Sequence, residues 1–290
     1  MNLSTTRYWT ALGTGLLLAL GSRAAETNKT EATTNKPEVS IFPDKNLETA
    51  VRKFVFEKRD NNKPITEADV VSLSTINGSG GQIKDLTGLE KCKSLASLDL
   101  SKNQISKLGP LKDLKSIQYL NLANNQIEDV SPLADIAALQ YIELSNNKVK
   151  DIKPLASLTN MASLYLGNNQ IPDISPVLKM TRLSSFYLEN NQVESIKGIG
   201  ALHGLMSLSL SKNRITDISP ITGLDNLYWL FLDNNKITDL TPLANAARKD
   251  YEGEKRFSPY LNLYVGGNPL NSASKKQLST MKDYGTRVNN

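Results

Sequence analysis

The side chains that could act as nucleophile and base are a single cysteine and a single histidine, Cys92 and His203. One cysteine cannot form an internal disulfide or a metal site built from several thiolates. Histidine is the commonest residue in metal binding and in acid–base catalysis, and this chain has only one. The sequence has a repeat of 22 residues, and Cys92 and His203 lie five repeats apart. At one strand spacing per repeat, the two side chains are separated by roughly 24 Å. Because a nucleophile and its base cannot meet at that distance, the sequence predicts no catalytic residue, no metal site and no cofactor, and a protein that is not an enzyme. We interpret Cys92 as a buried structural thiol and His203 as a surface residue.

Aspartates recur two residues before a Ser-Pro, Thr-Pro or Lys-Pro pair, where they could cap a turn or bind cations. They are Asp129, Asp151, Asp173, Asp217 and Asp239. A carboxylate at this position can accept the backbone amide hydrogens that open the turn, so capping is our interpretation. Five ordered carboxylates would also suit cations, and the sequence leaves that alternative open.

Aromatic residues recur at strand positions that should face outward, and they suit protein binding. Exposed rings on a rigid sheet supply a large contact area at low entropic cost. We therefore predict the ligand-binding residues Tyr119, Tyr141, Tyr165, Tyr187, Tyr228, Trp229, Phe231 and Tyr264. Tyr119 should neighbour Tyr141, Tyr165 should neighbour Tyr187, and the last four should gather near the C-terminal end.

Two other interpretations of this surface stay open at the level of sequence. The preference of aromatic residues for strands accounts for some of them without any ligand, and the C-terminal group could pack beneath an insertion at 247–257. Glu143, Glu189 and Asp233 add acidic groups to the same face, where solvation by water is the simplest role.

The element that positions these residues is a repeat of 22 residues. Its unit reads L-x-x-L-x-L-x-x-N-x-I-x-x-I-x-P-L-x-x-L, with an asparagine column at Asn103, Asn125, Asn147, Asn169, Asn191, Asn213 and Asn235. The alternation in Leu98-Asp99-Leu100-Ser101 predicts one short strand per repeat with its leucines inward. Strands stacked one per repeat form a parallel sheet, and an asparagine after each strand can satisfy backbone groups that the turn leaves unpaired.

Proline marks the limb that returns to the next strand. A hydroxyl before proline, as in Ser131-Pro132, is placed to cap a helical turn, and proline suits the first position of that turn. We expect a single 3₁₀ or α turn here, on the side opposite the sheet. The predicted fold class is therefore an α/β solenoid with a parallel β-sheet on its concave face, short turns on its convex face and helical caps.

Helices are predicted at both ends of the stack, where they would cover its exposed core. Before the repeats, Asp44 is the predicted N-cap of a helix whose apolar stripe runs from Leu47 to Val55, and Thr66 and Asp69 have capping-box spacing. After the repeats, the segment from Asn271 to Gly285 predicts a closing helix.

The first 24 residues have the features of a secretory signal peptide. Arg7 gives a positive start, residues 10–20 form an apolar run, and Ser22-Arg23-Ala24 places small residues at a cleavage site. The run of about 11 residues is too short for a bilayer-spanning helix, which takes roughly 20. We expect cleavage after Ala24 and a secreted, periplasmic or cell-surface chain without a transmembrane segment, with an uncleaved anchor as the alternative.

The chain divides into five segments by composition. We predict a signal peptide at 1–24, a disordered linker at 25–39, an N-terminal helical cap at 40–70, eight repeats at 71–246, and an insertion, terminal repeat and C-terminal helical cap at 247–290. The balance of 34 basic and 29 acidic residues gives a net charge of +5. Such a mixed surface lacks the single-sign field typical of nucleic-acid binding, so we expect no nucleic-acid partner.

The N-terminal cap and opening repeats resemble those of bacterial internalins, in the segments IFPDKNLETAVRKF, PITEADVVSLSTI and IKDLTGLEKCKSLASLDLSKNQISKLGPL. The resemblance covers Ile41 to about Leu270 and combines the cap, the 22-residue period and the proline column. It implies a right-handed leucine-rich repeat superhelix that is exported and binds protein ligands on its concave sheet, several members being adhesins on host cells. The sequence shows no Leu-Pro-x-Thr-Gly wall-sorting motif, no lipid-attachment cysteine after the cleavage site and no immunoglobulin-like module.

The predicted function is therefore that of an exported, monomeric binding protein that recognises a protein ligand, on a host or another cell surface, through the aromatic residues named above. A glycan is the second ligand class. The alternative of a different kind is a regulatory scaffold similar to the intracellular 22-residue-repeat proteins that dock onto phosphatases, with residues 1–24 as a mere extension.

Overall fold

The computed structural model describes residues 39–289, which form one continuous stack of repeats. The predicted signal peptide at 1–24 and the predicted linker at 25–39, apart from Val39, lie outside the described residues. Within the described range, strands alternate with short helices along the chain, so that each repeat contributes one strand and one return limb.

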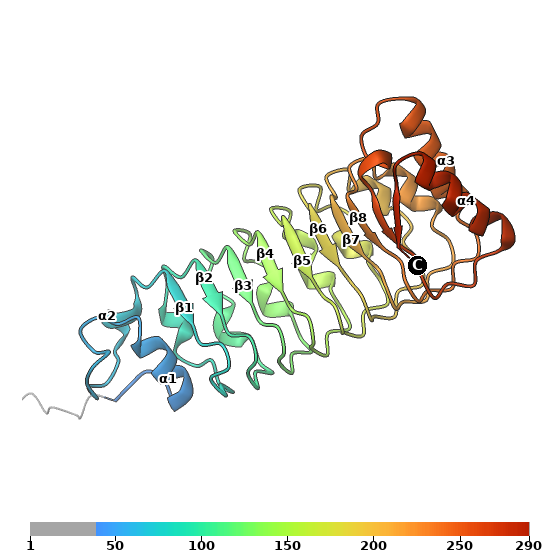
Figure 1. Cartoon of the computed structure of the whole chain (residues 1–290). Helices are drawn as coiled ribbons and strands as arrows, with labels where there is room; N and C mark the ends of the chain where they lie inside the picture. Colours follow the sequence, from blue (N-terminus) through green and yellow to red (C-terminus); the bar gives the residue numbers. More distant parts are fainter. Residues whose placement is uncertain (1–38, 290) are drawn as a thin grey trace, which may run out of the picture. The chain divides into compact units, whose positions relative to one another are not determined.

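A single parallel sheet of ten strands runs along the stack (Figure 1). Each strand pairs with the strands before and after it in the sequence, and partners from β1 to β8 are 22 residues apart. This order confirms the predicted solenoid. The strands are β1 (Thr75–Asn77), β2 (Ser97–Asp99), β3 (Tyr119–Asn121), β4 (Tyr141–Glu143), β5 (Ser163–Tyr165), β6 (Ser185–Tyr187), β7 (Ser207–Ser209), β8 (Trp229–Phe231), β9 (Asn262–Tyr264) and β10 (Arg287–Asn289).

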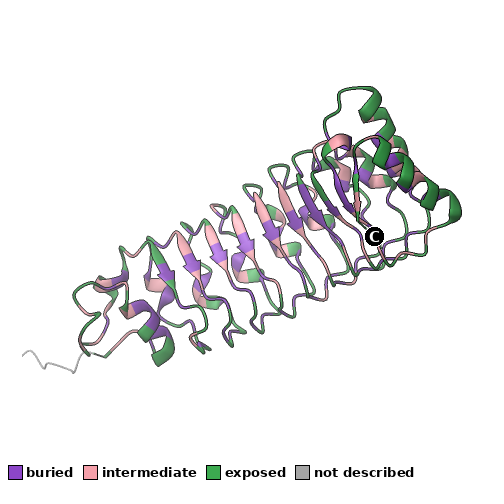
Figure 2. Ribbon diagram, viewed as in Figure 1, coloured by how far each residue is buried: buried purple, intermediate pink, exposed green. Residues whose placement is uncertain are grey.

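The core is a continuous array of apolar side chains between the sheet and the return limbs. The middle residue of every strand from β1 to β9, such as Leu98 or Phe186, is fully buried. The first and third residues lie on the other side of the pleat, and most of them are half-buried (Figure 2). We call this outer side of the sheet the strand face.

A buried asparagine after each strand joins neighbouring repeats, as predicted. The Nδ2 of Asn169 donates to the carbonyls of Leu144 and Leu166, both at 3.0 Å, and its Oδ1 accepts from the amide of Val149 at 2.9 Å. Equivalent bonds recur at the other six positions of the column. Buried backbone groups need partners, so the column stabilises the turn that would otherwise leave them unpaired.

The return limbs form short 3₁₀ helices of three to five residues on the side opposite the sheet, where the sequence predicts helical turns (Figure 1). They lie between consecutive strands and bring the chain back to the start of the next strand. They are η1 (Leu89–Lys91), η2 (Gly109–Leu111), η3 (Ser131–Leu133), η4 (Lys153–Ser157), η5 (Ser175–Val177), η6 (Ile199–Ala201) and η7 (Ser219–Gly223).

The recurring aspartates cap these turns. Asp173 accepts the backbone amide and the hydroxyl of Ser175, both at 2.8 Å, and the other four aspartates make the same amide bond. The prediction that the hydroxyl itself caps the turn is wrong, because that hydroxyl donates to the aspartate. The serine is also the first residue of the turn, and the proline is the second.

These caps predict a defined pH dependence of stability. The backbone amide and then the hydroxyl of the following serine lower the pKa of Asp129 and of Asp173. Because the pKa is lowered in the folded state, the ionised aspartates stabilise the fold at pH values above the ordinary aspartate pKa of about 4. This stabilisation is lost as the pH falls through the lower, folded-state pKa. In thermal unfolding from pH 7 to pH 2, we expect Asp129→Asn with Asp173→Asn to lower the Tm at pH 7 and to match the wild type in acid. A difference in Tm that does not change with pH would contradict this role of the charge.

Two short helices cover the first repeat. Asp44 caps the first of them, as predicted, and the Asp69 carboxylate accepts from the amide of Thr66 at 2.6 Å in the predicted capping box. The first helix is shorter than the apolar stripe from Leu47 to Val55 predicts. Val55 is buried, but it lies in the turns that follow the helix. The helices are α1 (Lys45–Arg52) and α2 (Glu67–Val70).

The C-terminal segment differs from the prediction in two places. The repeat pattern predicts a single turn for the eighth return limb, before the insertion, but this limb continues into the insertion as a helix of 12 residues, α3 (Thr241–Glu252), followed by the 3₁₀ turn η8 (Ser258–Tyr260). The predicted closing helix is confirmed as α4 (Ser272–Asp283), capped by Asn271. Beyond it the chain adds β10, which pairs with β9 and which the sequence did not predict. No helix in the described range 39–289 has the length and apolar character needed to cross a membrane.

Candidate functional site

Six aromatic rings form a continuous row on the strand face, and we call this row the aromatic ladder. Its successive ring centroids are separated by 4.5 Å (Tyr119–Tyr141), 5.4 Å (Tyr141–Tyr165), 5.0 Å (Tyr165–Tyr187), 6.4 Å (Tyr187–Phe231) and 4.6 Å (Phe231–Tyr264). Trp229 flanks its C-terminal end, 6.2 Å from Phe231 and 6.4 Å from Tyr264. The ladder therefore extends from β3 to β9.

The strand register brings the predicted neighbours together. Tyr119 pairs with Tyr141 as the first residue of each strand, and Tyr165 pairs with Tyr187 as the third. The ladder changes position between β4 and β5, where Tyr165 is paired with Glu143. The row of rings thus shifts once, by two residues along the strand direction, between β4 and β5.

Strand β7 carries Ser209 where both neighbouring strands carry rings, and Ser207 between Ser185 and Trp229. Ser207 and Ser209 are only 8% and 5% exposed, and the hydroxyls of Tyr187 and Ser207 are hydrogen-bonded at 2.6 Å. The small side chain of Ser209, paired with both Tyr187 and Phe231, leaves room for those two rings to approach each other. The serines of β7 therefore keep the ladder continuous.

Tyr228 lies apart from the ladder, in an adjoining pocket of about 380 Å³ that we call the apolar slot. Its ring lies 6.2 Å from that of Tyr260. Four of the eight exposed large hydrophobic residues in the described chain line this slot. Its full lining is Met206, Ser207, Tyr228, Trp229, Tyr260, Asn262 and Arg287.

Sequence reasoning missed Met206, Tyr260 and Arg287 as parts of this surface. Met206 and Tyr228 are one period apart, at the position just before the strand, so the sequence did contain a signal for one of them. Tyr260 and Arg287 follow segments that interrupt the period, and no spacing rule placed them.

Two acidic side chains border the centre of the ladder. One carboxylate oxygen of Glu143 accepts the amide of Ser145 at 2.7 Å. Burial, together with the charge of Glu189, raises the pKa of Glu143. The Glu189 carboxylate lies over Gly167, where a Cβ would overlap it, and its Oε2 is buried without a hydrogen-bond partner. A buried polar oxygen without a partner is unfavourable, so the Glu189 carboxylate is incompletely satisfied.

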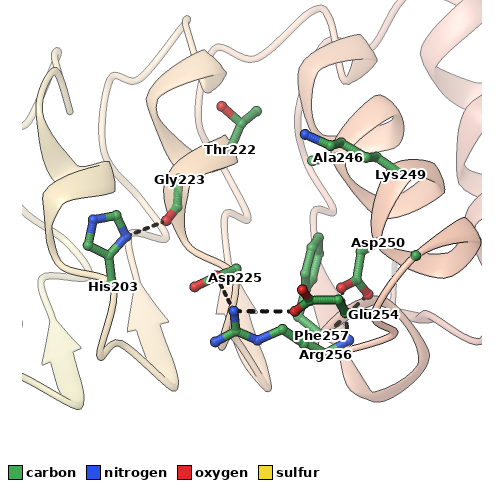
Figure 3. A pocket seen from close by; sticks show the side chains of 11 residues that line it. His203, Thr222, Gly223, Asp225, Ala246, Lys249, Asp250, Glu254, Arg256 and Phe257 are labelled. Carbon is green, nitrogen blue, oxygen red and sulfur yellow. Dashed lines mark hydrogen bonds and ion pairs between the residues drawn. The ribbon is translucent and has the colours of Figure 1, made fainter.

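The insertion forms a separate pocket of about 440 Å³ beside the return limbs (Figure 3). Arg256 ties the insertion to the repeats through Asp225 at 2.7 Å, and His203 Nδ1 lies 3.0 Å from the carbonyl of Gly223. No ladder residue lines this pocket, helix α3 packs on η7, η8 and α4, and Trp229 is 42% exposed. The alternative that the insertion covers the C-terminal aromatic residues is therefore wrong.

The structure keeps Cys92 and His203 apart. Cys92 is fully buried beneath the first repeats, whereas His203 is exposed five repeats further along the stack. Within residues 39–289, no group of three or more His, Cys, Asp or Glu side chains could hold a metal ion. The candidate site is the aromatic surface, because its rings form one continuous row of contacts.

Cys92 is expected to be chemically inert in the folded chain. Burial raises the pKa of its thiol to about 12, and only the thiolate reacts with disulfide reagents. At pH 8 the native chain should not react with Ellman's reagent over an hour, and unfolding in guanidinium should release one thiol per chain. Rapid labelling of the native chain would show that the first repeats open.

Comparisons with known proteins agree with this architecture. A family model described as leucine-rich repeats (2 copies) matches residues 93–135, 137–179, 159–201 and 204–245. The chain shares 33% identity with internalin C2 of Listeria monocytogenes, with a TM-score of 0.69, over 80% of this chain and 95% of that one. For an internalin (inlF) of the same organism the values are 26% identity, a TM-score of 0.66, and 89% and 95% coverage.

A leucine-rich repeat protein of Leptospira interrogans shares the fold, at 21% identity, a TM-score of 0.59, and 70% and 56% coverage. No curated protein sequence matches the chain significantly. Leucine-rich repeat proteins are in general scaffolds that bind other proteins. The repeat model covers more than half of the chain, and the likeness to internalin C2 spans nearly all of that protein. The chain therefore belongs to the internalin-like leucine-rich repeat proteins of bacteria.

Proposed function

We propose that this chain is an exported, non-catalytic binding protein that recognises a protein ligand through the aromatic ladder, in adhesion or another contact at a cell surface. The observation that carries the proposal is the continuity of the ladder from β3 to β9. Strand preference accounts for aromatic residues in strands, but it does not require them to meet in one row. Aligned rings on a rigid sheet resemble the hot spots of protein interfaces.

The membership in the internalin-like family supports a protein as the ligand. The insertion, the caps and the return limbs occupy the ends and the other side of the stack, which leaves the strand face open to a partner (Figure 1). The apolar slot beside the ladder could receive one large side chain of that partner, since it combines exposed rings with a single cation, Arg287.

A capture experiment tests the ladder. The chain is used as bait against cell-surface and envelope extracts, beside a variant with Tyr165, Tyr187, Trp229 and Phe231 replaced by alanine. A partner retained by the wild type and lost by the variant is the expected result. A partner retained equally by both would move the binding site to the caps, the return limbs or the C-terminal helices.

Export is tested separately by the N-terminus of the protein found outside the cytoplasm. We expect Edman degradation or mass spectrometry to begin at Ala25, which is the residue after the proposed cleavage site. A full-length chain confined to the cytoplasm would instead favour the regulatory scaffold that docks onto another intracellular protein.

A further inference from the structure

The charge of the strand face is opposite to that of the whole chain. The chain carries a net charge of +5. Among the residues that point outward from β1 to β9, including the second residue after each strand, every charged side chain is acidic. These are Asp99, Glu143, Glu189 and Asp233, and the first basic residue on this face is Arg287 in β10.

Two of these four carboxylates are already satisfied within the fold. Asp99 accepts the amide and hydroxyl of Ser101. Asp233 accepts the amide of Gly266 at 3.0 Å and the hydroxyl of Ser211 at 3.1 Å. Glu143 also accepts an amide, that of Ser145, but it is half-buried beside the charge of Glu189, and Glu189 keeps one buried oxygen without a partner. Glu143 and Glu189 are therefore the two carboxylates that a cation from a partner would stabilise most.

Glu143 and Glu189 both border the central ring pair of the ladder, Glu143 beside Tyr165 across the sheet and Glu189 beyond the two rings along the strand direction. Tyr165 is paired with Glu143 on one side and with Tyr187 on the other, and Glu189 is the second residue after Tyr187 and leans over Gly167, the second residue after Tyr165. Neither glutamate forms an ion pair with a described residue. Two carboxylates that border two stacked rings form a surface that suits a cationic side chain.

A cation supplied by a partner would relieve two costs at once. It would pair with carboxylates that are partly removed from water and repel each other. It would also lie against the faces of tyrosine rings, which attract guanidinium and ammonium groups. Arginine suits this arrangement best, since its planar group can stack on a ring and bind a carboxylate with two hydrogen bonds.

We propose that the partner segment bound on the aromatic ladder is basic, and that one of its arginine or lysine side chains stacks on Tyr165 or Tyr187 and pairs with Glu143 and Glu189. This inference rests on the proposed function of the strand face as a protein-binding surface. It adds the chemistry of the partner, which neither the ladder nor the family specifies.

The test uses a phage-displayed library of random peptides, selected on the immobilised chain at a low ionic strength of about 0.05 M, where exposed charge pairs are least screened. The enriched peptides are sequenced and their binding is measured on three variants. The first is Tyr165→Ala with Tyr187→Ala, the second is Glu143→Gln with Glu189→Gln, and the third is Glu57→Gln with Glu128→Gln. The third removes the same charge from two exposed glutamates away from the strand face.

The Glu143→Gln, Glu189→Gln variant should remain folded. Its new side chains keep the shape of glutamate, and the amide oxygen introduced by Glu143→Gln can still accept the backbone N–H of Ser145. Because the folded chain disfavours the charged form of Glu143, removal of that charge should leave the Tm at pH 7 unchanged or higher. A change in binding by this variant can then be assigned to charge.

We expect the selected peptides to be enriched in arginine and lysine relative to the library. Their affinity should fall about tenfold or more on both the tyrosine and the Glu143/Glu189 variants and stay unchanged on the Glu57/Glu128 control. Peptides that need the tyrosines, show no basic enrichment and bind the Glu143/Glu189 variant normally would overturn this inference and leave the proposed function standing. Peptides that bind the tyrosine and the Glu143/Glu189 variants as tightly as the wild type would contradict both this inference and the proposed function. A selection that yields no tyrosine-dependent peptide would also contradict both.

Discussion

The double variant Tyr165→Ala with Tyr187→Ala is expected to bind its protein partner about 100-fold more weakly than the wild type. Each ring is a candidate hot spot, and truncation of such a residue typically costs about 2 kcal/mol or more in binding free energy, with incomplete additivity between neighbours. The two rings stack at 5.0 Å at the centre of the ladder. The measurement is the dissociation constant for the captured partner, by surface plasmon resonance.

The chain offers a closely matched control for this variant. Tyr251 and Tyr284 stack at 5.1 Å with an interplanar angle of 27°, against 5.0 Å and 29° for Tyr165 and Tyr187, but they lie away from the strand face on α3 and after α4. Tyr251→Ala with Tyr284→Ala removes the same groups and should keep full affinity. Equal losses in the two double variants would show that the strand face has no special role.

The ladder variant should lose little stability. Its rings are half-buried and lie outside the core. The main losses are therefore three ring contacts, with Tyr141, between the two rings and with Phe231, and the hydrogen bond between Tyr187 and Ser207. Each ring contact contributes about 0.2–1 kcal/mol and the hydrogen bond about 1 kcal/mol, so we expect the Tm to fall by several degrees for a domain of this size. A collapse of the Tm would instead mean that these tyrosines belong to the core.

Replacement of Asn169 by alanine is expected to lower the free energy of unfolding by about 3 kcal/mol, the largest stability effect that we predict. The amide of Val149 would lose its acceptor, and the carbonyls of Leu144 and Leu166 would each lose one of two asparagine donors. A buried backbone group left without its partner costs about 1–3 kcal/mol. Urea unfolding followed by circular dichroism measures the difference.

Asn160→Ala is the control for this change. Asn160 lies in the same repeat but is exposed, and its side chain donates to the carbonyl of Ala137 at 2.9 Å from the surface. Surface substitutions of this kind stay within about 0.5 kcal/mol. A similar small loss for Asn169→Ala would contradict the role of the asparagine column in joining repeats.

The fold followed from the sequence because a strict period determines the register. Once Leu98 and Leu120 occupy the same place in successive units, the pairing of Ser97 with Tyr119 has no alternative. The prediction failed where the period stops. Helix α3 begins with Thr241-Pro242, like the shorter turns, and β10 has only Val288 pointing toward the core, so neither carried a repeat signal.

The binding surface was predictable by position but not by contact. The register placed Tyr165 beside Tyr187, yet it could not show that the Tyr187 hydroxyl bonds to Ser207 or that Glu189 leans over Gly167. Side chains on the outer side of a sheet lean toward whichever neighbour is small, and that depends on the packing of several strands together. The contacts between these side chains are therefore properties of the structure alone, whereas the change of ladder position between Tyr141 and Tyr165 follows from the register.

Photo-crosslinking from the strand face tests the central claim most directly. p-Benzoylphenylalanine is placed at position 187 in one version of the chain and at position 251 in another, and each is irradiated with the captured partner. We predict a covalent adduct with the partner from position 187 and none from position 251, because only Tyr187 lies on the aromatic ladder. An adduct from position 251 alone would contradict the claim that the partner binds the strand face.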